Sequence, residues 1–305
     1  GVLSIAAAGV ARGQTHRRMS IPDSTSHVPV APAPSIRERL ARALLAGGAK
    51  WSADDYTAHD VRAPAIVFAP HPDDEVLGCG GTIALKAMAG SELRVVIMTD
   101  GRTSHAQFID AQTLIEMRRA EAADASEQLG LDPSAYTFLD FEDNRLGEHA
   151  DRARQRVVEL LRRDRPEQVF VPHRRDRLRD HTATYDIVTS AIREVGTRVT
   201  VLEYPVWLWN TWPWTNTLPR LRSVFTEVPR MLRDSAELAF GCRTRVDIRS
   251  VLPRKLGALA QYRSQVQRHR DDPRWPILSD VSAGAFIERF RCGSEGFRCT
   301  EQGAL

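Results

Sequence analysis

The chain has 305 residues, of which 42% are hydrophobic and 27% charged, and its 42 basic and 39 acidic residues give a net charge of +3. This length and composition fit an ordinary globular protein with one large α/β domain or two small ones. Basic and acidic residues are interleaved, which argues against nucleic-acid binding, and no stretch reaches the roughly 20 apolar residues of a membrane helix.

Residues 1–35 are expected to form a disordered arm, because residues 20–35 are rich in Pro, Ser, Thr and Ala and have little apolar surface to bury. The apolar residues 2–8 fit either a clipped signal peptide or a leader encoded upstream of Met19. Residues 36–305 are predicted to form a single domain. Four cysteines without zinc-finger spacing favour free thiols and a cytoplasmic location, and in an exported chain Cys292 and Cys299 could form a disulfide.

Helices and buried strands alternate after the arm. Ser35 can cap a first helix that ends at Leu45 and is closed by Gly47 and Gly48. The patterns predict strands at 65–69, 93–99, 136–139, 168–171 and 199–204, and helices at 83–89, 111–129, around 157–161 and from about 182. This β-α-β alternation predicts a Rossmann-like α/β fold, a parallel sheet sandwiched by helices.

The region after Tyr204 departs from this alternation. It begins with an aromatic run, for which core packing and stacking on a sugar or acyl chain are equally good explanations. A basic region that favours helices follows it to the C-terminus. The tryptophans of the run are Trp207, Trp209, Trp212 and Trp214.

A polar cluster directly follows the buried strand 65–69, at the sheet edge where ligands bind in open α/β folds. Histidine and aspartate suit Zn²⁺, and a third ligand from elsewhere would leave one position open for water. A polar loop that caps a helix is the alternative for this cluster taken alone. The glycine-rich residues 78–82 lack the lysine of a phosphate-binding loop, so a nucleotide site is not expected. The cluster comprises His71, Asp73, Asp74 and Glu75.

His181 follows another predicted strand, 168–171. Parallel strands bring their carboxyl ends to one edge, so this imidazole can face the first cluster. Alone, His181 would be interpreted as a helix-capping or surface histidine. Together, His71, Asp74 and His181 predict a catalytic zinc site, and Asp73 remains free as a general base toward water.

These residues resemble the LmbE-like (PIG-L) family of zinc-dependent N-deacetylases. The resemblance implies metal binding by His71, Asp74 and His181, Asp73 as the base, and removal of an acetyl or other acyl group from an N-acylated amino sugar or glycoside. It further implies that Arg118 lines the substrate site and that Glu75 supports the metal ligands. The matching stretches are His71-Pro72-Asp73-Asp74-Glu75, Arg118 to Ala122, the set Pro172, Asp176, Asp180 and His181, and residues 255–265.

Arg102, just past strand 93–99, is a second candidate for the substrate site and is equally well explained as a solvated loop residue. The expected partner is a small glycoside or amino sugar, and an oligomer is possible.

The family usually has a histidine where this chain has Leu178, and that histidine stabilises the oxyanion or protonates the leaving group. His173 and His105 are candidate replacements, although each also fits an ordinary loop histidine. The presence of Leu178 in place of the family histidine supports an alternative function, that of a metal- and sugar-binding protein with lost or weak catalysis.

Overall fold

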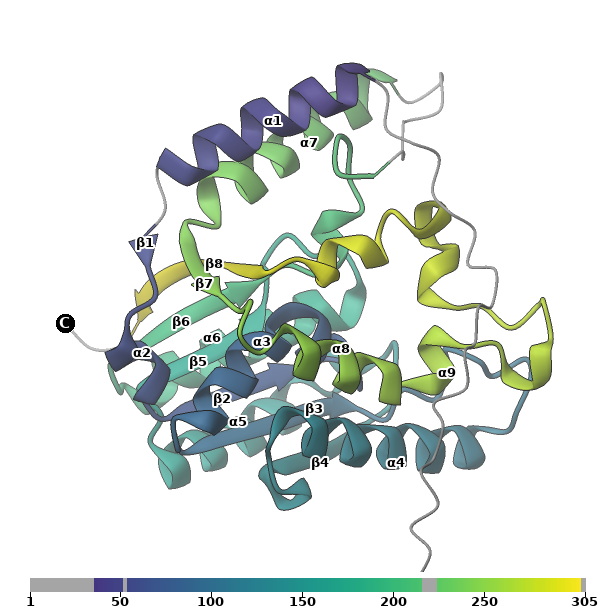
Figure 1. Cartoon of the computed structure of the whole chain (residues 1–305). Helices are drawn as coiled ribbons and strands as arrows, with labels where there is room; N and C mark the ends of the chain where they lie inside the picture. Colours follow the sequence, from purple (N-terminus) through teal and green to yellow (C-terminus); the bar gives the residue numbers. More distant parts are fainter. Residues whose placement is uncertain (1–35, 52–53, 216–223, 303–305) are drawn as a thin grey trace, which may run out of the picture.

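The computed structural model describes residues 36–51, 54–215 and 224–302 (Figure 1). In this part of the chain eight strands form one sheet in the order β1-β7-β8-β6-β5-β2-β3-β4. The predicted arm, its boundary at residue 35 and the Ser35 cap lie outside the described residues. The strands are β1 Asp54–Asp55, β2 Ala65–Ala69, β3 Leu93–Thr99, β4 Tyr136–Phe141, β5 Gln168–Pro172, β6 Val199–Tyr204, β7 Thr244–Asp247 and β8 Ser294–Gln302.

The five predicted strands are confirmed as β2 to β6, and neighbours among them pair in parallel. β2 lies in the middle of this set, with β3 and β4 on one side and β5 and β6 on the other. The strand order therefore reverses between β2 and β5. In open α/β sheets such a reversal opens a crevice at the carboxyl ends of the two strands.

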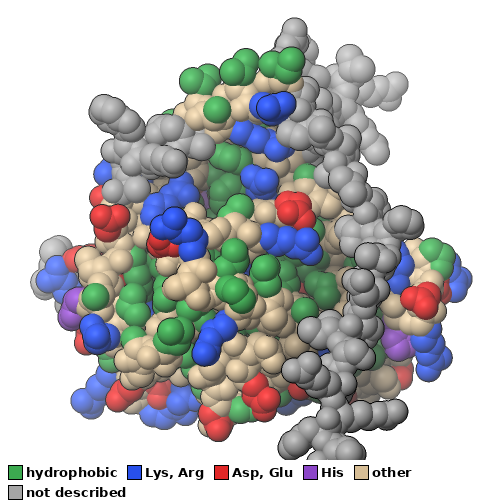
Figure 2. Space-filling model, viewed as in Figure 1, with side chains coloured by type: hydrophobic (Ala, Val, Ile, Leu, Met, Phe, Trp, Pro, Cys, Tyr) green, Lys and Arg blue, Asp and Glu red, His purple; other side chains and the backbone are tan. Residues whose placement is uncertain are grey.

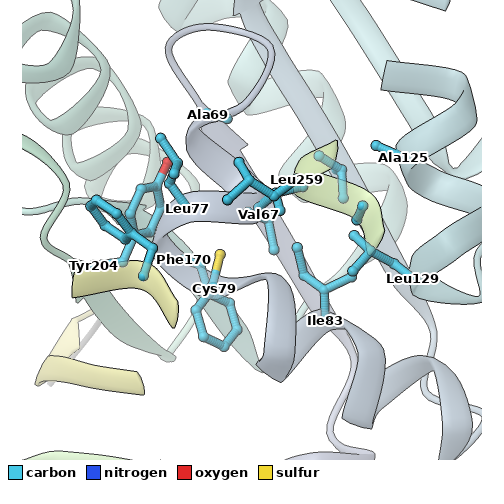
Figure 3. Packing of buried hydrophobic residues seen from close by; sticks show 14 of the residues in the cluster. Val67, Ala69, Leu77, Cys79, Ile83, Ala125, Leu129, Phe170, Tyr204 and Leu259 are labelled. Atoms are coloured by element: carbon cyan, nitrogen blue, oxygen red, sulfur yellow. The ribbon is translucent and has the colours of Figure 1, made fainter. Parts of the chain in front are cut away.

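Helices cover both faces of the sheet, as predicted (Figure 1). One hydrophobic core contains side chains of α3, α4 and α8, and a second contains side chains of α5 and α6. Figure 3 shows part of the first core, in which Val67 of β2 lies near Ile83 of α3 and Leu259 of α8. The helices are α1 Ile36–Trp51, α2 Ala58–Arg62, α3 Asp74–Met88, α4 Ala111–Leu129, α5 Ala150–Asp164, α6 Arg179–Val195, α7 Val224–Ala236, α8 Leu252–Gln261 and α9 Arg263–Val266.

Helix α3 starts earlier than predicted, at Asp74 instead of Ile83, so the glycine-rich residues 78–82 are helical. Close packing explains the glycines. A Cβ atom on Gly78 would lie 2.1 Å from the Tyr204 ring, nearer than real contacts allow. Gly78 thus lets α3 approach β6, which fixes the position of the residues at the N-terminus of the helix.

Helix α1 continues to Trp51, past the two glycines that were predicted to end it. Glycine lowers helix stability by only about 1 kcal/mol, so neighbouring residues can carry a helix through it. Ile36, Leu40 and Leu44 are 75%, 60% and 77% exposed, and hydrophobic side chains line this surface at the top of Figure 2. Leu45 instead packs against a small core beneath α1.

The C-terminal region, predicted to be helix-prone, also supplies β7 and β8. β8 pairs antiparallel with β6 and β7, so the whole sheet is mixed. The parallel prediction holds for β2 to β6, and the short strand β1 also pairs in parallel with β7. Three of the four tryptophans pack against other aromatic rings: Trp207 stacks on Phe286, and Trp209 meets Trp214 edge to face. No helix among the described residues has the length and apolarity needed to span a bilayer.

Candidate metal centre and active site

The candidate site lies at the carboxyl ends of the parallel strands. The loop after β2 and the first turn of α3 supply His71, Asp73 and Asp74, while His181 comes from the first turn of α6, after β5. α6 begins at Arg179, slightly before the predicted start. The strand reversal brings these two segments together.

Three predicted ligands meet around one carboxylate oxygen. Oδ2 of Asp74 lies 3.0 Å from Nδ1 of His71 and 3.2 Å from Nε2 of His181. One ligand atom from each of the three residues can be chosen so that all lie within 4.8 Å of one another. Two imidazole nitrogens and one carboxylate oxygen are a donor set that zinc uses in catalytic sites.

Asp176 orients His181 toward this centre. Its Oδ2 atom lies 3.1 Å from Nδ1 of His181 and also accepts hydrogen bonds from the backbone N–H groups of Val206 and Trp207. Nδ1 of the imidazole therefore carries the proton, which leaves the lone pair on Nε2. That buried Nε2 atom has no hydrogen-bond partner among the described residues, as expected of a metal ligand.

A second pair of carboxylates holds His71. Its Nε2 atom lies 3.2 Å from Asp143 and 3.4 Å from Asp180. Asp180 also accepts hydrogen bonds from the backbone N–H groups of Asn144 and Leu146. Neither Asp143 nor Asp180 was predicted to take part in the site, although Asp143 follows β4 at the same sheet edge, a position that could have indicated it. His71, Asp143 and Asp180 form a second group whose atoms could hold an ion.

The carboxylates dominate the electrostatics of the centre. Burial acts to lower the pKa of His71, but three surrounding carboxylates outweigh it and raise that pKa well above the ordinary value. Burial opposes protonation of His181 too, yet Asp74 and Asp176 raise its pKa to about 9. Burial would raise the pKa of Asp74, whereas the two histidines hold it well below the usual range. Such a negative environment stabilises a bound cation.

Asp73 has an unusual backbone conformation, with φ at 123°, where residues other than glycine are strained. Its N–H group donates to Oε2 of Glu75 at 3.1 Å, and Arg118 donates to the carbonyl of Pro72 just before it. Burial raises the pKa of Asp73 to about 8, although the charge of Arg118, 3.4 Å away, acts to lower it.

Glu75 points away from the candidate ligands and into a buried cluster of hydroxyl groups. Its Oε1 atom accepts hydrogen bonds from Tyr262 and, at 3.3 Å, from Tyr136. Burial raises its pKa to about 7. Glu75 belongs to neither candidate ion-binding group, and it supports the backbone that presents Asp73.

The two predicted substrate-site arginines differ in position. Arg118 is 3% exposed and contacts Asp73, and its buried Nε atom has no hydrogen-bond partner among the described residues. Arg102 is paired with Asp100, Nε to Oδ2 at 2.7 Å. The structure thus brings Arg118 to the centre and holds Arg102 to its own loop.

Neither replacement histidine forms a hydrogen bond or ion pair with the three candidate ligands in the described part of the chain. Nδ1 of His173 accepts a hydrogen bond from the backbone N–H of Arg175, and its Nε2 atom lies 3.3 Å from Glu237. His105 stacks on Trp275, and its Nε2 atom lies 2.9 Å from the carbonyl of Pro276.

Comparison with solved structures identifies the class of fold. The chain is similar to N,N'-diacetylchitobiose deacetylase from Pyrococcus horikoshii, with a TM-score of 0.54 and 20% identity over 88% of this chain and 94% of that one. It is also similar to a deacetylase triple mutant of the teicoplanin biosynthetic pathway, with a TM-score of 0.55 and 17% identity over 79% of this chain and 99% of that one. At this identity the similarity shows a shared fold.

Sequence comparison agrees with the predicted resemblance. The family model described as PIG-L, GlcNAc-PI de-N-acetylase, matches residues 66–192, so the predicted resemblance to the LmbE-like (PIG-L) family is confirmed over this part of the chain. The uncharacterized deacetylase YaiS of Escherichia coli is 27% identical over 139 residues, 44% of this chain and 70% of that protein. Diacetylchitobiose deacetylase of Thermococcus kodakarensis is 30% identical over 107 residues, 35% of this chain and 39% of that protein.

Proposed function

We propose that the chain is a zinc-dependent hydrolase that removes an acetyl group from the amine of an N-acetylated amino sugar or glycoside. The observation that carries the proposal is the position of Nε2 of His181. This buried atom lies 3.2 Å from Oδ2 of Asp74 but makes no hydrogen bond to any described residue. A strained and buried aspartate, Asp73, directly precedes Asp74 in the chain. A protein that only folded around this loop would not need such an arrangement.

His71, Asp74 and His181 would hold the metal. Asp176 and Asp143 would orient the two imidazole rings, because their carboxylates lie 3.1 Å from Nδ1 of His181 and 3.2 Å from Nε2 of His71. When bound, zinc supplies Lewis acidity toward an acyl carbonyl and toward water.

Asp73 acts first as the general base and then as the general acid. In its ionised form the carboxylate removes a proton from the attacking water as the new C–O bond forms. The same carboxyl group then gives that proton to the amine nitrogen as the C–N bond breaks, which yields acetic acid and the free amine. Arg118 favours the ionised form before attack, because its positive charge opposes the effect of burial.

Two observations support the substrate class. The family description and the two relatives above name de-N-acetylation or deacetylation, and one relative acts on diacetylchitobiose. The buried Nε atom of Arg118 offers a hydrogen-bond donor beside Asp73. A sugar hydroxyl or an acyl oxygen can accept from such a donor. The cytoplasmic location, the single domain and the possible oligomer stay predictions.

The experiment that tests the proposal measures zinc and amine release together. The purified protein is analysed for metal and then incubated with N-acetylglucosamine, its methyl glycoside and diacetylchitobiose, and primary amines are quantified. We expect one zinc per chain and amine release that a chelator abolishes. Amine release that survives full removal of metal would overturn the proposed mechanism.

A metal- and sugar-binding protein with lost or weak catalysis is the second candidate, and Leu178 favours it. This residue stands just before α6, is 39% exposed, and has no group that can donate to an oxyanion. Bound zinc and saturable binding of the same sugars, with no amine released, would establish this alternative.

A further inference from the structure

An open cavity lies beside the loop that connects β5 to α6. Its volume is about 360 Å³, and α7 borders its other side. Five arginines and two aspartates line it, which leaves an excess of three positive charges. The lining residues are Arg174, Arg175, Asp176, Arg177, Thr182, Arg230, Arg233 and Asp234.

The acidic groups nearby do not neutralise these arginines. Arg174 and Arg175 share one carboxylate, that of Glu237, at 3.7 and 3.2 Å. Arg298 and His173 face the same carboxylate at 3.1 and 3.3 Å, and both also lie near Glu203, at 3.6 and 3.8 Å. Arg174 and Arg175 therefore share a single carboxylate that two further groups also contact.

The other side of the cavity is also short of negative charge. Arg177 pairs with Asp234, and Arg230 pairs with Glu227 one turn earlier on α7. Arg233 is exposed and has no acidic partner among the described residues. The carboxylate of Asp176 is already occupied by backbone N–H groups and by His181. Like charges held this close repel one another, so an anion between them would lower the electrostatic energy.

We propose that this cavity binds a phosphate group. Guanidinium groups recognise phosphate through paired N–H donors, and several arginines match its two negative charges better than they match a single carboxylate. The cavity shares Asp176 with the candidate metal centre, where that residue orients His181. The phosphate is either part of the molecule that enters the metal centre or a free ion that binds beside it.

A titration tests the site without relying on catalysis. Inorganic pyrophosphate is titrated into the zinc-loaded protein by calorimetry, and the double variant Arg230→Gln/Arg233→Gln is compared with the wild type. Each lost guanidinium contact should weaken binding by about tenfold, because one charged hydrogen bond contributes on that order. Arg274→Gln is the matched control, since this arginine is 80% exposed and pairs with Asp272 outside the cavity.

The metal centre needs its own control, because pyrophosphate also binds metal ions. Asp74→Ala should retain the wild-type pyrophosphate affinity if the arginine cavity is the site. Absence of binding to the wild type, equal affinity in the double variant, or loss of binding in Asp74→Ala would each overturn the proposal.

A kinetic comparison separates the two sources of phosphate. N-acetylglucosamine and its 1-phosphate are compared as substrates of the wild type and of the double variant. A preference for the phosphate ester that disappears in the double variant assigns the group to the substrate. Pyrophosphate binding without such a preference assigns it to a free ion. If neither compound is hydrolysed, the proposed deacetylation fails, while the titration still decides the phosphate site.

Discussion

Replacing Arg118 by glutamine should move the pH range in which the protein is active. Asp73 must be ionised to take a proton from water, and burial already raises its pKa to about 8. Nη2 of Arg118 lies 3.4 Å from Oδ2 of Asp73, and its positive charge opposes that rise. Glutamine keeps a hydrogen-bond donor but has no charge. The variant should therefore have a higher Asp73 pKa.

The distance sets an upper limit on the size of this shift. Two unit charges 3.4 Å apart interact by about 5 kcal/mol at an effective dielectric constant of about 20, or roughly 3.6 pKa units. The amide dipole of glutamine and rearranged neighbours recover part of that energy, so we expect a rise of about one to two units. The charge of a bound metal lowers the Asp73 pKa in both proteins and cancels in the comparison.

The assay is the pH dependence of kcat/KM for amine release. A protonated Asp73 cannot act as a base, so the acid limb of the profile should move to higher pH by the same one to two units. Arg119→Gln is the control, because its side chain is 42% exposed and pairs with Asp140. An acid limb that stays in place in Arg118→Gln, with zinc content unchanged, would refute Asp73 as the group that Arg118 tunes. A changed KM alone would assign Arg118 to substrate binding only.

Three further predictions concern single side chains. Asp74→Ala should purify with little zinc, whereas Asp73→Asn should keep zinc and lose turnover. Metal analysis and the amine assay check both results. An active Asp73→Asn variant would contradict the assignment of Asp73 as the base. Leu178→His should raise kcat by up to about 10²–10³, and an unchanged kcat would show that an oxyanion donor is already present. Gly78→Ala should lower the free energy of unfolding in urea by about 1–3 kcal/mol, because its methyl group overlaps an aromatic ring, while Gly147→Ala, with its nearest neighbour 3.9 Å away, should change it little.

The candidate metal ligands could be predicted because each depends on a local pattern. His71 and Asp74 follow an apolar strand directly, and His181 follows another one, so the parallel-strand rule was enough to bring them together. Their supporting groups depend on distant backbone. Asp176 orients His181 only because the chain around Val206, some 30 residues later, donates N–H groups to its carboxylate.

The C-terminal strand could not be predicted for a related reason. β8 reads Ser-Glu-Gly-Phe-Arg-Cys-Thr-Glu-Gln, with one large apolar residue, Phe297, and several charged ones. Its strand conformation comes from antiparallel pairing with both β6 and β7. Strand preference depends on such neighbours more than on the residues themselves.

Leu178 is where sequence and structure together narrow the possible mechanisms. The sequence suggested His173 or His105 as the missing donor, and that replacement stays a prediction. Both imidazoles, however, have protein partners of their own: His173 with Arg175 and Glu237, and His105 with the Pro276 carbonyl. Moving either ring to the metal centre would break these buried contacts, which is costly. The contacts therefore favour a site in which neither histidine replaces the family histidine at the position of Leu178. In that site Arg118 is the cation held next to Asp73.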